Sequence, residues 1–155
     1  MIGWRMAFVA GHVKIIQAFA DVKDNCDSGQ FMAIQHAAAA ALADKSIAER
    51  TREKYRRRLQ KLVGALTRVG FRARMPGGTY FLYARAPKAC AGRTFANAEE
   101  VSQFLITEQS VCCVPWDDAG PHLRFSVTYQ AADEAAEDAL MAATVERLAA
   151  LKLVF

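Results

Sequence analysis

The chain has 155 residues, 53% of them hydrophobic and 23% charged, which is typical of one globular domain and excludes a disordered or fibrous protein. The net charge is +4, and Lys and Arg residues are concentrated between residues 45 and 74. Four cysteines lack metal-ligand spacing, and neither a secretory signal nor a membrane-spanning stretch is evident, so we expect a reduced, cytoplasmic protein without a metal site.

Residues 1–11 form an apolar run that predicts a buried strand, interrupted by one charged side chain, Arg5. A buried guanidinium requires an anion or several acceptors, and nothing nearby in sequence supplies one. Two interpretations therefore stay open at this point: Arg5 reaches water at a strand edge, or it meets an anion.

Helical spacing predicts two helices, over residues 12–23 and 30–43, separated by turn formers among which we interpret Asp27 and Ser28 as caps. A longer helix is predicted from Ser46, whose capping box with Glu49 precedes an amphipathic pattern that ends at Gly70. We expect its outward face to hold the basic residues Arg50, Arg52, Lys54, Arg56, Arg57, Arg58 and Lys61. This face is interpreted as solvated, with nucleic-acid binding as the alternative.

The remaining pattern predicts strands over residues 79–84, 111–114 and 122–128, with a further strand beginning at 71–74. Helices are expected after the cap Asn97 and from about residue 132, the latter with the inner face Leu140, Val145, Leu148 and Leu151. The fold class is therefore α+β: helices on one side of a small, mostly antiparallel sheet. Residues 1–45 fall outside this plan.

The sequence contains no motif of a hydrolytic or nucleophilic site. Asp117 and Asp118 are interpreted as loop residues, the three histidines as packing or surface residues, and Cys112-Cys113 as a pair pointing to opposite faces. What remains is two isolated arginines in apolar surroundings, Arg5 and Arg124, each able to bind an oxyanion through two hydrogen bonds.

Several motifs resemble the class I/II aminotransferases of the pyridoxal-phosphate fold type I group, and LL-diaminopimelate aminotransferase-like enzymes most of all. They span the whole chain: Gly3-Trp4-Arg5, Asp27-Ser28-Gly29-Gln30-Phe31, Pro76-Gly77-Gly78-Thr79-Tyr80-Phe81, Pro115-Trp116-Asp117-Asp118-Ala119-Gly120 and Leu123-Arg124-Phe125-Ser126. The resemblance implies that residues 1–45 are a remnant of the large cofactor domain. It also implies that residues 46–155 are the small C-terminal domain.

The resemblance further implies roles for both arginines: Arg5 would hold the phosphate of pyridoxal phosphate, and Arg124 the α-carboxylate of the substrate. The family moves an amino group between an amino acid, here diaminopimelate-like, and a 2-oxo acid. Its Schiff-base lysine lies just before the position that Met1 matches. We therefore expect the chain alone to contain no catalytic residue, to bind no pyridoxal phosphate and not to transaminate.

Two other functions are kept as alternatives. One is a non-catalytic association domain, because apolar surface of residues 1–45 would favour homo-oligomers. The other, ranked last, is nucleic-acid binding through Arg56-Arg57-Arg58, which lacks interleaved aromatic residues.

Overall fold

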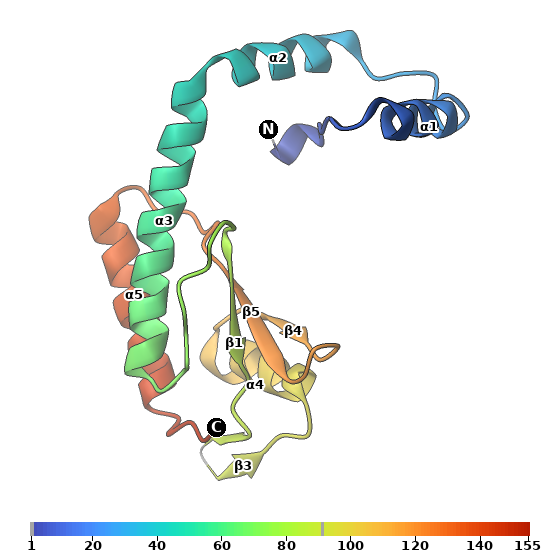
Figure 1. Cartoon of the computed structure of the whole chain (residues 1–155). Helices are drawn as coiled ribbons and strands as arrows, with labels where there is room; N and C mark the ends of the chain where they lie inside the picture. The colour runs from blue at the N-terminus through green and yellow to red at the C-terminus, as the bar shows by residue number, and fades with distance from the viewer. Residues whose placement is uncertain (1, 91) are drawn as a thin grey trace. The chain divides into compact units, whose positions relative to one another are not determined.

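The computed structural model describes residues 2–90 and 92–155, and the chain divides into two units, Met1–Thr51 and Arg52–Phe155. The division falls within the long helix α3, Lys45–Arg68. The elements are labelled along the chain in Figure 1. The assignment of residues 1–45 to a large cofactor domain remains a prediction.

The first unit contains a short 3-10 helix, η1 (Ile2–Trp4), and two α-helices, α1 (Val13–Asp24) and α2 (Met32–Ala43). His12 caps α1, since its Nδ1 accepts a hydrogen bond from the backbone N–H of Lys14 at 3.2 Å. Between the two helices, Asp27 pairs with Lys23 instead of capping α2. Both predicted helices are confirmed.

The predicted opening strand is wrong. Residues 6–12 have no regular structure, and the side chains of Trp4 and Phe8 are 61% and 69% exposed. A strand requires a neighbour to take up its backbone hydrogen bonds. None of the strands found in the described residues pairs with this segment.

Helix α3 begins one residue earlier than its predicted capping box, because Asp44 and not Ser46 supplies the cap. The Asp44 Oδ1 atom accepts a hydrogen bond from the backbone N–H of Ser46 at 3.0 Å. The helix stops where predicted: Gly70 adopts a left-handed conformation with φ 97°, and the Phe71 N–H donates back to the Leu66 carbonyl at 3.0 Å.

The second unit is built on a three-stranded antiparallel sheet with strand order β1-β5-β4. These strands are β1 (Phe81–Arg85), β4 (Val114–Trp116) and β5 (His122–Ser126), and a small ladder joins β2 (Ala89–Cys90) to β3 (Arg93–Thr94). Residues 71–74 are not a strand. Pro115, expected to stop a strand, lies inside β4, which tolerates it because β4 is at the sheet edge.

Three helices cover one face of this sheet, which confirms the α+β prediction. They are α3, α4 (Ala98–Gln109) and α5 (Glu134–Ala149), and Figure 1 shows α3 and α5 running side by side. The core between helices and sheet includes Leu66, Leu82, Leu105, Leu123, Phe125 and Leu148. None of the described helices has the length and apolar character needed to cross a membrane.

The inner face of α5 differs from the prediction at one position. Leu148 and Leu151 are buried as expected, but Leu140 is 39% exposed. The buried position in the first half of the helix belongs to Glu137 instead.

Candidate functional site

Arg124 lies at the middle of β5, the central strand, on the sheet face opposite the helices. Its neighbours Leu123 and Phe125 point into the core, at 0% and 5% exposure, so the alternation of the strand turns Arg124 outward. The register places Tyr83 and Val114 directly across from it on the two flanking strands.

Aromatic rings from both flanking strands surround the Arg124 guanidinium. Its central carbon lies 4.4 Å from the Phe81 ring centroid and 5.4 Å from that of Trp116, distances typical of cation–π contacts. Tyr83 meets Trp116 edge to face, with centroids 6.0 Å apart. We call Phe81, Tyr83 and Trp116 the aromatic cradle.

The guanidinium makes no hydrogen bond to any described residue, and its Nε atom is also buried from solvent. A desolvated donor without an acceptor is unfavourable, and a charged one more so. Arg124 is therefore a cation whose position is fixed by stacking while its hydrogen-bonding capacity is free. A planar anion such as a carboxylate suits that arrangement, because it accepts two parallel hydrogen bonds from one guanidinium.

Arg5, the other predicted anion-binding residue, belongs to the first unit. It is exposed, follows η1 directly and has a left-handed backbone with φ 55°. Within the described part of that unit, no side chain is hydrogen-bonded to it. Arg5 and Arg124 lie in different units, and each is described in its own unit only.

The other residues considered as functional candidates have structural roles or no identifiable role. Asp117 accepts a hydrogen bond from the Ala98 N–H, and His122 Nδ1 lies 2.9 Å from the Gly120 carbonyl oxygen. Cys112 is exposed and Cys113 buried, as predicted for opposite faces. Burial raises the pKa of the Cys113 thiol to about 11, which makes it a poor nucleophile. The described residues contain no cluster able to hold a metal ion.

Sequence reasoning missed a buried charge cluster around Glu137, which is 2% exposed. Its carboxylate accepts hydrogen bonds from Arg57 at 3.1 and 3.2 Å and from Arg58 at 2.7 Å, and lies 3.3 Å from Lys61 Nζ. The Arg57 guanidinium lowers the pKa of Glu137 to about 2, with Arg58 and Lys61 acting in the same direction against the effect of burial.

The interpretation of Arg58 as part of a solvated basic face is wrong, since Arg58 is 3% exposed. Its Nη1 donates to the Val127 and Tyr129 carbonyls at 3.1 and 2.7 Å, just beyond the end of β5. A signal was present in the sequence, because Arg58 lies three residues after Tyr55 and four before Leu62 on one helical stripe.

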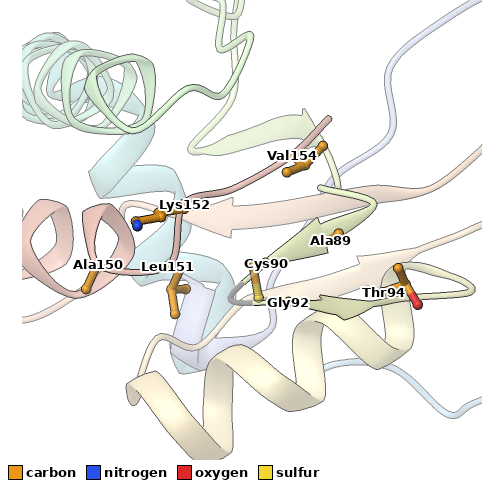
Figure 2. Close-up of a pocket in the computed structure, with 8 residues that line it drawn as sticks. All are labelled: Ala89, Cys90, Gly92, Thr94, Ala150, Leu151, Lys152 and Val154. Atoms are coloured by element: carbon orange, nitrogen blue, oxygen red, sulfur yellow. The ribbon is translucent and has the colours of Figure 1, made fainter.

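A separate hollow of about 640 Å³ lies between the β2–β3 ladder and the segment after α5 (Figure 2). Its lining is mostly small or apolar: Ala89, Cys90, Gly92, Thr94, Ala150, Leu151, Lys152 and Val154. Desolvation raises the pKa of the Cys90 thiol, so this residue is not poised for reaction. The described residues that line the hollow include no group of convergent polar side chains like the one expected of a binding site.

Comparison with known proteins shows the family. The profile of "Aminotransferase class I and II" matches residues 1–140. The chain belongs to this aminotransferase family. The LL-diaminopimelate aminotransferase of Methanocaldococcus jannaschii is 53% identical over 134 residues, which are 86% of this chain and 32% of that protein. That of Methanococcus maripaludis is 47% identical over 161 residues, covering 100% of this chain and 39% of that protein.

Aminotransferase structures share the fold as well. Substrate-bound BacF from Bacillus subtilis superposes with a TM-score of 0.79 at 30% identity, over 99% of this chain and 37% of that one. The chain thus spans 32% to 39% of the lengths of these aminotransferases.

Class I and II aminotransferases depend on pyridoxal phosphate, whose phosphate group is the anion predicted for Arg5. A phosphate site needs several converging donors, such as backbone N–H groups at a helix terminus. Around Arg5 the described part of the first unit gathers none. Within the described part of this unit, Arg5 is thus one element of a phosphate site and not a complete one.

Proposed function

We propose that this chain supplies the substrate-carboxylate side of an aminotransferase, with Arg124 holding the α-carboxylate of an amino acid or 2-oxo acid. The observation that carries the proposal is the free, stacked guanidinium of Arg124 in the aromatic cradle. Its donors match a carboxylate in number and geometry. The relatives named for LL-diaminopimelate support a diaminopimelate-like amino acid as the substrate.

Arg5 is our candidate for holding the cofactor phosphate once further donors surround it. The 155 residues alone are not expected to bind pyridoxal phosphate or to transaminate. We propose that none of the chain's own lysines takes the role of the family's Schiff-base lysine, the group that combines with the cofactor aldehyde. Adding pyridoxal phosphate to the purified chain, reducing with borohydride and mapping peptides tests this. A specifically labelled lysine would refute it.

The Arg124 assignment is tested by titrating 2-oxoglutarate into the full chain and following the Arg124 Nε–H signal by NMR. We expect this signal to shift in a saturable manner in the unmodified chain. Because Arg124→Gln lacks the reporting group, 2-oxoglutarate binding to the variants is measured by calorimetry, and this response should disappear in Arg124→Gln. Arg85→Gln is the matched control, because Arg85 lies on the same sheet face, opposite His122. An equal loss of response in both variants, or no response in the unmodified chain, would contradict the assignment.

A second candidate function, association through the first unit, is favoured by its exposed apolar side chains. Val13 and Phe31 are both at least 70% exposed, and Phe8 and Met32 are exposed as well. Such residues favour self-association in water. Light scattering over a range of concentrations tests this, and a monomer at the highest concentration would exclude it. We also propose a cytoplasmic location, which the free cysteines support.

A further inference from the structure

Trp116, one wall of the aromatic cradle, lies between two hydrogen bonds that tie its strand to helix α4. On one side, the Ser102 hydroxyl donates to the Cys113 carbonyl at 2.8 Å. On the other side, the Ala98 N–H donates to Asp117 Oδ1 at 2.9 Å. Both ties begin on α4, so this helix holds the segment 113–117 at its two ends.

The two ties differ in their surroundings. Ser102 is buried, so its hydroxyl has no water to replace the carbonyl. Ala98 is the first residue of α4, where backbone N–H groups lack partners within the helix and the helix dipole favours a negative charge. The Asn97 side chain satisfies Glu100 N, and the Asp117 carboxylate satisfies Ala98 N.

The Trp116 side chain has little else to orient it. It is 39% exposed on an edge strand, and its ring contacts Tyr83 and the Arg124 guanidinium, not the core. Position along the chain therefore decides whether the indole reaches Arg124. The ladder between β4 and β5 sets the register of Trp116, opposite His122, and the two hydrogen bonds to α4 hold both ends of its segment.

We propose that Asp117 is a positioning residue for Arg124: by capping α4 it keeps Trp116 against the guanidinium and so fixes the plane in which Arg124 meets a carboxylate. This inference rests on the proposed role of Arg124. The guanidinium is held between the Phe81 and Trp116 rings, and removing one wall frees the terminal rotations of a long side chain. A carboxylate must then order that side chain on binding, which weakens the complex.

The test compares Asp117→Ala, Asp117→Asn and Asp118→Ala in the full chain carrying Trp4→Phe, so that Trp116 is the sole tryptophan. Asp118 is the control, since its carboxylate makes no hydrogen bond among the described residues. Asparagine keeps an oxygen that can accept from Ala98 N. Two quantities are measured: acrylamide quenching of Trp116 fluorescence, and 2-oxoglutarate affinity from the Arg124 Nε–H signal.

In Asp117→Ala we expect stronger quenching and an affinity about threefold to tenfold weaker, the cost of ordering one long side chain. In Asp117→Asn, the quenching and the affinity should both return close to the parent values. Asp118→Ala should match the parent in both measurements. A helix cap with a purely structural role would lower the melting temperature of Asp117→Ala and leave the affinity of the folded protein unchanged. That result would overturn the inference.

The same experiment separates the inference from the proposal beneath it. If the parent chain shows no saturable Arg124 response, the carboxylate role fails, whereas the quenching series still reports whether Asp117 holds Trp116. Ser102→Ala provides a second variant that cuts the other tie. It should move quenching and affinity in the same direction as Asp117→Ala, and no change in either would count against the inference.

Discussion

Replacing Glu137 by alanine is expected to destabilise the second unit more than any surface substitution. The carboxylate is 2% exposed and lies within 3.3 Å of three cationic side chains, one of which, Arg58, is itself 3% exposed. Without Glu137, the Arg58 charge stays buried with only the carbonyls of Val127 and Tyr129 as acceptors. The penalty comes chiefly from that uncompensated charge.

Removing one partner from a buried ion pair costs about 3–5 kcal/mol. Domains have an unfolding free energy of about 5–15 kcal/mol, so the loss would be a large part of the total. For a unit of the size of Arg52–Phe155, each kcal/mol lowers the melting temperature by about 4–8 °C. Urea denaturation followed by circular dichroism measures the change directly through the transition midpoint.

Glu134→Gln is the matched control for this prediction. Glu134 lies on the same helix and pairs with Arg57 at 3.1 Å, but its side chain is 64% exposed. A water-exposed pair contributes little, so this variant should unfold near the parent midpoint. Equal midpoints for Glu137→Ala and Glu134→Gln would refute the reasoning that burial makes the Glu137 cluster important.

Other predictions concern pH, a turn, the core and a cap. The pKa of Glu137 is about 2 in the folded protein against an ordinary 4.5. The carboxylate therefore stabilises the folded state fully above pH 4.5, and this contribution is lost as the pH falls toward 2. The difference in urea midpoint between the parent and Glu137→Gln should shrink over that range. Gly70→Ala should cost about 1–3 kcal/mol in denaturation, because φ is 97° and the new Cβ would lie 3.3 Å from Phe155 Cε2. Leu123→Ala, at a fully buried position, should cost about 2–5 kcal/mol by the same assay. Asn97→Ala removes the cap on Glu100 N and should cost about 1 kcal/mol, with Gln103→Ala on the exposed face of α4 as the neutral comparison.

Local signals in the sequence predicted most of the second unit correctly. Asn97 caps α4, Gly70 ends α3, and a strand forms over His122–Ser126, within the predicted residues 122–128. These features depend on residues within a few positions of one another. Local physics is enough to predict them.

The two largest errors concern partners distant in sequence. From the sequence, Arg58 is predicted to be solvated because charged side chains are usually exposed. Its partner Glu137, which makes burial possible, lies 79 residues away along the chain. The opening segment was predicted as a strand from its apolar residues, but a strand needs a neighbouring strand as well as a suitable composition.

For the same reason, the sequence predicts only part of the candidate site. An isolated arginine in an apolar strand already indicated an anion, and Arg124 is that residue. The walls of its cradle come from β1 and β4, and only the strand order β1-β5-β4 brings them to it. No pattern within one segment contains that order.

The strand order also affects how the second unit folds. Among the described residues, strands β1 and β4 each pair only with β5, which is the last of the three in sequence. Until β5 docks between them, both have open edges of the kind that recruit other chains into aggregates. The strand that carries Arg124 thus completes the sheet, and a slow or failed docking of β5 would leave the protein prone to misassembly before any site exists.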